Sequence, residues 1–345
     1  MDVGRRRLVL GSGRFSVIVA VRSLIVGLAA AALSVVLGLV ALALGDFPLT
    51  VTEVVGVLAG QVQGLPIVVT EWRLPRAVAA IVFGAALAVA GAVFQSVTRN
   101  PLASPDIIGL ANGSFTGMLV ALLLLGGSWP LLTAGSLIGG LLAAVAIYLL
   151  AYRTGLQGFR FIVVGIGVSA MLASVNTWML LRVELETALF ASAWGAGTLN
   201  SVTTSTLLPA GALIVLLLAL LSLVTPAIRQ LDLGDDAAAA TGVAVNRARL
   251  VAITIAVGLV SAVTAVAGPI AFVALAAPQI TRRLTRSAGI PFAATAAVGG
   301  VLLLGSDLIA QHVIPLTVPV GVVTVVLGGG YLVWLLIHES RRRRA

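Results

Sequence analysis

The feature that most constrains this fold is an apolar run from Ala77 to Val97, in which only two adjacent side chains are polar. A helix of about 20 such residues matches the roughly 30 Å hydrocarbon core of a bilayer. Gly84, Ala88 and Ala92 follow one another at intervals of four, a spacing of small residues that lets two helices approach closely in lipid. The run therefore predicts a membrane-spanning helix in close contact with its neighbours.

The rest of the chain repeats this pattern. Its composition is 60% hydrophobic and only 10% charged over 345 residues, which is far less charge than a soluble protein of this length carries. We therefore predict an all-α polytopic membrane protein with about ten transmembrane helices. The ten apolar runs cover residues 24–44, 77–97, 106–125, 129–151, 160–181, 204–224, 249–267, 269–281, 291–312 and 319–337. The eighth run is short and carries Pro269 and Pro278, so we expect a broken or tilted element there.

The first apolar run follows an arginine-rich segment and has the layout of a signal peptide, with Ala41 to Ala43 as a candidate cleavage site. However, its length of about 20 residues exceeds the roughly 7 to 15 apolar residues of a signal peptide. We therefore expect a retained first helix. The chain then divides into a basic N-terminus over residues 1–23, a ten-helix domain over 24–337 and a basic tail over 338–345.

Positive charge predicts the topology. The chain contains 21 arginines and no lysine. Alternate threading of the ten runs, with residue 1 in the cytoplasm, leaves only Arg73, Arg76 and Arg182 outside, as the positive-inside rule requires. Both termini are then cytoplasmic. The basic pI of about 11.5 therefore indicates topology signals and contacts with anionic lipid, and we expect no nucleic-acid partner.

One cytoplasmic loop, residues 225–250, differs from the others. Gly234, Asp235 and Asp236 offer N-cap acceptors and negative charge at a helix start, four alanines favour helix, and Gly242 is placed to end it. This pattern predicts a short capped helix outside the bilayer. Two interpretations remain open: a connector lying on the membrane surface, or a knob that docks into another protein.

Several kinds of active chemistry are not supported. A chain without lysine cannot form the lysine-containing loop that binds the phosphates of ATP, so any hydrolysis must occur on a separate subunit. Cysteine is absent, and the two histidines, His312 and His338, lie far apart in no spaced ligand cluster. We therefore expect neither an enzyme nor a metal site.

Two acidic residues stand out near the membrane. Asp307 lies within the ninth run, where a charge costs on the order of 3 kcal/mol at the bilayer centre, so its side chain should face the bundle interior. It is either a structural acid bonded to neighbouring helices or a participant in transport. Asp106, next to Pro105, is expected to cap the third helix.

A series of motifs in a fixed order resembles the FecCD family, the permease subunits of ATP-binding-cassette importers for ferric siderophores, haem and cobalamin. The resemblance runs from about residue 45 to 337. The matching residues are Arg73-Leu74-Pro75-Arg76, Gly84-Ala85-Ala86-Leu87, Gly91, Gln95, Arg99-Asn100-Pro101-Leu102-Ala103, Pro105, Gly109, Trp194-Gly195, Leu233-Gly234-Asp235, Ala239, Gly242, Gly268-Pro269-Ile270, Phe272-Val273, Ser306-Asp307-Leu308 and Pro319-Val320-Gly321.

The resemblance implies a permease of the cobalamin and siderophore type in the inner membrane. It implies ten helices per subunit, a second permease that is identical or a paralogue, two cytoplasmic ATPases and an extracytoplasmic substrate-binding protein. This chain would hold no cofactor of its own, since ATP is used by the partner ATPase. A ferric siderophore is the favoured cargo, with haem or cobalamin as alternatives. The rival of another class is an ion-coupled secondary transporter or channel with Asp307 as its ion site.

The family's site residues carry over by position. The segment that fits into a groove on the ATPase corresponds to Leu233, Gly234, Asp235, Asp236, Ala239, Thr241 and Gly242. Arg73 and Arg76 match outward arginines that meet acidic groups on the binding protein, although arginines at a helix end also snorkel toward water without any partner. Arg99-Asn100-Pro101 matches a helix-ending corner near the ATPase side.

This chain also departs from the family pattern. Gln311 stands where many relatives have a further arginine, so one docking charge is absent or is supplied by the partner permease. Ala274 replaces a common glycine, Gln279 a common histidine and Val318 a common glutamate.

Overall fold

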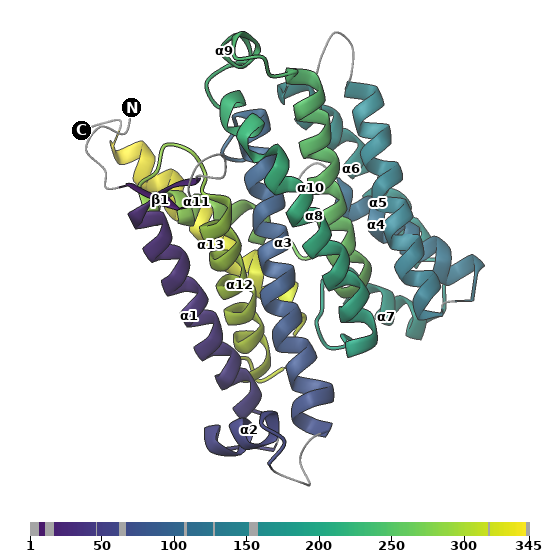
Figure 1. The fold of residues 1–345 in the computed structure, drawn as a ribbon. Helices are drawn as coiled ribbons and strands as arrows, with labels where there is room; N and C mark the ends of the chain where they lie inside the picture. The colour runs from purple at the N-terminus through teal and green to yellow at the C-terminus, as the bar shows by residue number, and fades with distance from the viewer. Residues whose placement is uncertain are drawn as a thin grey trace.

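The computed structural model describes residues 7–10, 17–45, 47–61, 67–106, 109–126, 128–151, 158–316 and 318–342. These residues form a bundle of helices, which confirms the predicted all-α class (Figure 1). Parts of the predicted basic N-terminus, residues 1–6 and 11–16, and the last three residues of the predicted basic tail lie outside the described residues.

The ten predicted runs correspond to ten helices in the described part of the chain. Seven of these helices are long and apolar enough to cross a membrane, and α4 and most of α13 are shorter apolar helices. Their bounds are α1 Val21–Ala43, α3 Leu74–Thr98, α4 Leu110–Leu124, α5 Trp129–Ala151, α6 Gly158–Leu180, α8 Thr204–Leu231, α10 Val245–Ala267, α11 Val273–Thr285, α12 Phe292–Leu308 and α13 Val320–Arg342.

Shorter elements lie between and before these helices. They are β1 Arg7–Leu10, β2 Val17–Ala20, α2 Val51–Leu58, α7 Leu185–Gly195, α9 Asp235–Ala240 and two π-helical segments, η1 Val68–Arg73 and η2 Ile309–Val313. The strands pair antiparallel, with Arg7 opposite Ala20. A capping box of Thr50 and Glu53 starts α2, which lies between the first two predicted runs, and α7 and the two strands were not predicted.

Helices α3 and α10 form the centre of the bundle. In each of them 78% of the apolar window is buried, against 6% in α1. Helix α3 packs most extensively against α12 and also contacts α10, α11 and α8. The outer helices therefore turn much of their apolar surface outward, toward lipid or a partner subunit.

The close helix approach expected from the small residues of α3 is present. A Cβ atom added to Gly84 would lie 2.3 Å from the carbonyl oxygen of Gly299 in α12, and one added to Gly299 would lie 2.4 Å from the Cβ of Ala88. The backbones of α3 and α12 are therefore in direct contact where the two helices cross. Gly91 makes a similar approach to α11, because its Cβ would lie 1.7 Å from the carbonyl oxygen of Ala274.

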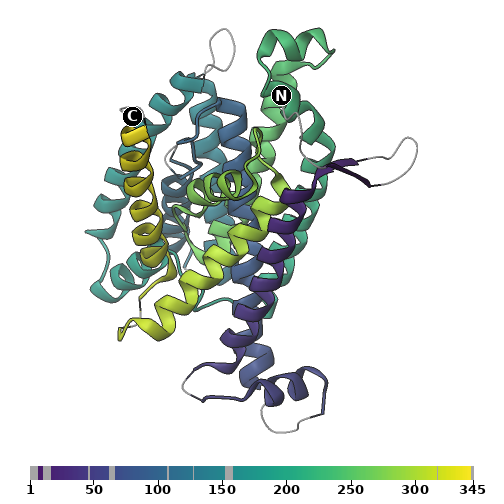
Figure 2. The ribbon, with the colours of Figure 1, turned by 90° about the vertical axis from the view of Figure 1, so that its left-hand side faces the viewer.

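The short helices mark the two ends of the bundle. Helix α9 projects at one end, and α2 and α7 lie at the opposite end (Figures 1 and 2). The start of α1 and the end of α13 lie on the same side as α9. Alternate threading of the ten runs likewise places the loop of α9 on the side of the termini.

Candidate coupling and docking sites

Helix α9 projects beyond the end of the bundle (Figure 1). We call α9 and its flanking residues, 233–242, the knob. It begins after Gly234, whose φ is 117°, and is followed by Gly242 at φ 86°. Both glycines adopt conformations that side chains rarely tolerate, so they define where this short helix starts and stops. The predicted helix is thus confirmed. Capping by an aspartate side chain is wrong, because the N-cap residue is Gly234 and, in the described chain, no side-chain hydrogen bond caps the start of α9.

The Asp235 carboxylate is instead bound by two arginines from the centre of the bundle. Arg249 of α10 donates from Nη2 to both carboxylate oxygens, at 3.0 and 3.1 Å, and the Nη2 of Arg99 donates to Oδ1. Partial burial raises the pKa of this carboxyl, but the bonds and charges of Arg249 and Arg99 outweigh burial and hold the pKa below its ordinary value. Asp235 therefore carries its negative charge throughout the neutral range.

Arg99 ends α3 and connects three helices. It adopts a left-handed conformation, with φ 50°, directly after Thr98. Its Nε donates to the carbonyl oxygen of Leu231, the last residue of α8, at 3.1 Å. The side-chain oxygen of Asn100 then accepts from the backbone N–H of Leu102 at 3.0 Å. The expected end of the helix at Arg99-Asn100-Pro101 is confirmed, and the corner lies directly beside α9.

A buried pair of glutamines continues the polar contacts from this corner into the bundle. Gln95 of α3 donates to the carbonyl oxygen of Leu275 at 3.1 Å, and Gln279 of α11 donates to the side-chain oxygen of Gln95. Gln279 also donates to the carbonyl oxygen of Pro101 at 3.3 Å. This network was not predicted. It ties α11 to α3 next to the Arg99 corner.

The remaining knob residues are available to a partner. Leu233 is 74% exposed, and Asp236 and Ala239 are exposed as well, whereas Ala238 is buried under the knob. Thr241 donates from its hydroxyl to the side-chain oxygen of Gln230 and to the carbonyl oxygen of Ala238. The knob thus offers an apolar and acidic outer surface while its base is bonded to the bundle.

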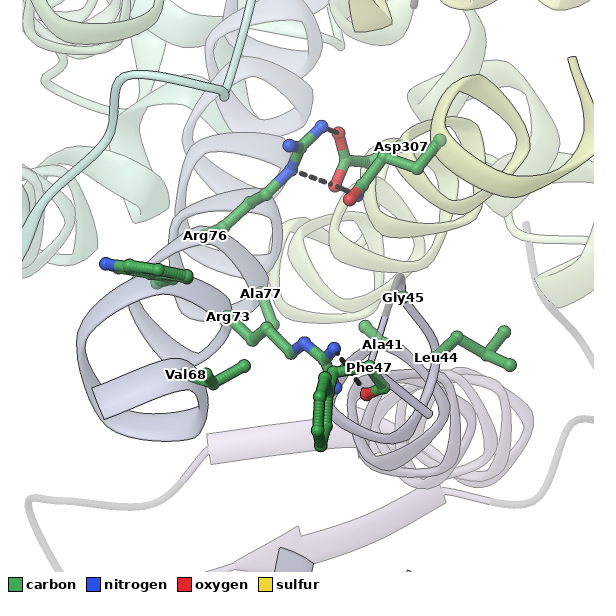
Figure 3. A pocket seen from close by; sticks show the side chains of 11 residues that line it. Ala41, Leu44, Gly45, Phe47, Val68, Arg73, Arg76, Ala77 and Asp307 are labelled. Atoms are coloured by element: carbon green, nitrogen blue, oxygen red, sulfur yellow. Dashed lines mark hydrogen bonds and ion pairs between the residues drawn. The ribbon is translucent and has the colours of Figure 1, made fainter. Parts of the chain in front are cut away.

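At the opposite end, Arg76 and Asp307 form a two-point ion pair between α3 and α12. The Nε and Nη2 atoms of Arg76 donate to the two oxygens of Asp307 at 2.9 and 2.8 Å, and Gln311 donates to Oδ2 at 2.6 Å (Figure 3). The Asp307 side chain is 2% exposed and that of Arg76 19%. This is the arrangement expected of a structural acid bonded to a neighbouring helix.

Arg73 holds the same region together through the backbone. Its Nη1 donates to the carbonyl oxygen of Leu42 at 2.8 Å, and its Nη2 donates to that of Phe47 at 2.8 Å. A cavity of about 350 Å³ lies between these groups and is lined by Arg73, Arg76 and Asp307 (Figure 3). Both arginines are therefore bonded within the chain, and their contact with a binding protein stays a prediction.

Asp106 has a different role from the one expected. Its Oδ2 accepts a hydrogen bond from the backbone N–H of Phe272 at 3.1 Å, and Phe272 is the residue directly before α11. Helix α4 begins only at Leu110, after Gly109 at φ 94°. The prediction that Asp106 caps the third membrane helix is wrong. Its carboxylate instead accepts a hydrogen bond from the backbone N–H at the start of α11, which is distant in sequence. In the described residues, no three His, Cys, Asp or Glu side chains gather as a metal site would require.

Comparison with known proteins shows extensive similarity in sequence. The model of the FecCD transport family matches residues 33–338. The ferric enterobactin transport system permease protein FepG of Escherichia coli is 45% identical over 327 residues, which cover 94% of this chain and 99% of that protein. The achromobactin transport system permease protein CbrC of Dickeya dadantii is 34% identical over 337 residues, covering 96% and 97% of the two chains.

The fold is also that of a solved transporter subunit. A structure described as an inward-facing conformation of a metal-chelate type ABC transporter matches with a TM-score of 0.79 at 24% sequence identity. The match covers 91% of this chain and 99% of the other. At that identity the comparison supports the arrangement of helices.

Proposed function

Since the chain belongs to the FecCD transport family, we propose that it is the permease subunit of an ATP-driven importer that carries a ferric siderophore across the inner membrane. The observation that carries this proposal is the end-to-end identity of 45% to a ferric enterobactin permease, together with a bundle of the same fold as a metal-chelate transporter subunit. The chain is a transport subunit of a complex, and in this proposal both of its termini would lie in the cytoplasm.

The energy for transport would come from other subunits. A chain without lysine has no phosphate-binding lysine loop, so two cytoplasmic ATPases would bind beneath the permease. The α9 knob, with Leu233 exposed, would fit into the ATPase surface. A second permease, identical or a paralogue, would complete the pathway, and closure of the ATPases would open it to one side and then the other.

A binding protein would deliver the chelate at the end that carries Arg73 and Arg76. The cavity between them would admit an acidic side chain of that protein, because its walls carry two guanidinium groups and one carboxylate. The net positive charge would favour an acidic partner. Gln311 is uncharged and is bonded to Asp307, so it adds no further charge to this surface.

The rival function, an ion-coupled transporter with Asp307 as its ion site, is less favoured by the geometry. An ion-coupling carboxylate has to release and rebind its ion, whereas Asp307 is held by both donors of Arg76 and by Gln311. Haem and cobalamin remain alternative cargoes of the same kind of importer.

Uptake into vesicles separates these functions. The permease would be reconstituted with its ATPase and binding protein, and accumulation of ferric enterobactin would be measured with and without ATP inside, using haem and cobalamin as competing cargoes. We expect uptake that requires ATP and persists when the proton gradient is collapsed. Uptake that continues without ATP and stops with the proton gradient would refute the proposal, and preferred uptake of haem or cobalamin would correct the cargo.

A further inference from the structure

The two central helices of the bundle meet at a single carboxylate of the knob. Asp235 begins α9, Arg99 ends α3 and Arg249 lies in the first turns of α10. The two arginines approach Asp235 from different helices and bind the same oxygen, Oδ1. We call these three side chains the knob joint.

The position of α9 depends on a small number of contacts. A helix of six residues is too short to be stable alone, and only Ala238 of it is buried. Its backbone continues into α8 and α10, and Thr241 bonds to Gln230 of α8. The bond from Arg99 to Asp235 links α9 to α3. These two helices are not neighbours in the sequence, so the backbone does not connect them directly.

The two ion pairs of the joint differ in strength. The Arg249 side chain is 10% exposed and that of Asp235 is 47% exposed, so water screens this pair only from the side of the carboxylate. The Arg99 side chain is 43% exposed, but it is also fixed by its bond to the carbonyl oxygen of Leu231. Charge-assisted hydrogen bonds are shorter and more directional than neutral ones, so they hold α9 in a defined orientation against both helices.

We propose that Asp235, Arg99 and Arg249 are the positioning residues through which a displacement of α9 reaches α3 and α10 together. This inference rests on the proposed role of α9 as the segment that the ATPase moves. A displaced α9 carries Asp235 with it, and the carboxylate pulls two arginines that belong to the most buried spans of the bundle. Without the joint, the knob would follow the ATPase while α3 stayed behind.

Asp236 provides a matched control. It is the next residue of the same short helix, also in its first turn, and its side chain is exposed. No ion pair of Asp236 occurs in the residues that the structure describes. Asp235→Asn and Asp236→Asn remove the same charge and weaken the helix start in the same way, but only the first breaks the joint.

The test uses the complete importer, with ATPase and binding protein, in vesicles supplied with ferric enterobactin. Uptake per ATP hydrolysed would be compared for the wild type, Asp235→Asn, Asp236→Asn and Ala238→Pro. We expect Asp235→Asn to bind the ATPase and hydrolyse ATP while its uptake per ATP falls about tenfold, as loss of a charge-assisted bond predicts. Asp236→Asn loses the same charge from the surface that would meet the ATPase, so any fall it causes measures that loss alone, and its uptake per ATP should stay several-fold above that of Asp235→Asn. Ala238→Pro, which breaks α9, should be uncoupled.

The outcomes distinguish this inference from the proposed function. Equal uptake per ATP for Asp235→Asn and Asp236→Asn, with Ala238→Pro uncoupled, would refute the proposed role of the knob joint. It would leave the coupling role of α9 intact. Full coupling in Ala238→Pro would overturn the coupling role itself.

A second variant and a distance measurement cover the case in which Asp235→Asn does not fold. Arg99→Gln removes the bond from α3 and keeps the bonds between Arg249 and Asp235, and it should lower uptake per ATP in the same way. The chain contains no cysteine, so spin labels at Ala240→Cys and Leu102→Cys report the distance from α9 to the end of α3. We expect a broader distance distribution in Arg99→Gln than in Asp236→Asn, and equal distributions would also overturn the joint.

Discussion

The ion pair of Arg76 and Asp307 predicts unequal losses of stability when either partner is removed. Arg76→Ala leaves the Asp307 carboxylate, 2% exposed, with Gln311 as its remaining donor among the described residues. Removing one partner of a buried ion pair costs about 3–5 kcal/mol, because the other charge stays buried without compensation. Asp307→Asn instead leaves a guanidinium that is 19% exposed and lines an open cavity, so water can replace its partner. We expect that variant to lose only about 1–3 kcal/mol.

The double variant adds a further expectation. Arg76→Ala combined with Asp307→Asn removes the unpaired charge, so it should recover part of the loss that Arg76→Ala causes alone. The measurement is reversible unfolding in mixed detergent and SDS micelles, followed by helix content. Arg182→Ala is a suitable control, since the guanidinium of Arg182 lies 5.5 Å from the ring centre of Trp178 and such a contact contributes about 0.5–1 kcal/mol at an exposed site.

Two results would contradict this reasoning. If Arg76→Ala and Asp307→Asn lost equal stability, the difference in exposure between the two side chains would not govern the cost. If the two losses simply added in the double variant, the side chains would not interact at all.

Three further predictions follow from other contacts. Gly84→Val should prevent α3 from packing on α12, because its Cβ would lie 2.3 Å from the carbonyl oxygen of Gly299, and the variant should elute as aggregate in size-exclusion chromatography. Arg73→Gln, compared with Arg182→Gln, should weaken capture of the binding protein at low salt and lose this difference at high salt. The pKa of Asp235 is lowered in the folded protein, so the stabilisation by its carboxylate is present above the unfolded pKa of about 3.9 and is lost as pH falls through the folded value. The melting temperature of the wild type minus that of Asp235→Asn should therefore be constant from about pH 8 to 5 and shrink below about pH 4; a difference that changes near neutrality would refute this assignment.

The membrane helices could be predicted because hydropathy reports burial in lipid directly. The run 77–97 differs from α3, Leu74–Thr98, by only a few residues. The eighth run ended too early, because the last turn of α11 carries Arg282 and Arg283 and continues to Thr285 beyond the apolar residues. Helix α7 was missed, since its sequence is too short and too mixed in polarity to stand out from a loop.

The partners of the charged side chains could not be predicted from the chain order. The glycines around α9 are local signals and correctly placed the knob. By contrast, Asp307 is 231 residues from Arg76, and Asp235 is 136 residues from Arg99. Ion pairs between such positions depend on how whole helices pack, and the spacing of residues along one helix contains no information about them. Asp106 shows the same limit, because its helix partner lies 166 residues away.

The backbone of Arg99 bears on why arginine stands at that position. An L-residue in the left-handed region, here at φ 50°, is destabilised by roughly 1–2 kcal/mol relative to the ordinary helical region, and glycine avoids this steric penalty. An ion pair as exposed as that of Arg99 with Asp235 stabilises by only about 0–1 kcal/mol, and the bond from Arg99 to the carbonyl oxygen of Leu231 adds about 0.5–1.5 kcal/mol. The steric gain and the loss of these two contacts nearly cancel, so replacing Arg99 by glycine should change the melting temperature little. A survey of variants by heat resistance alone would therefore overlook this side chain, whose importance should be visible in uptake per ATP and in the distances between α9 and the end of α3.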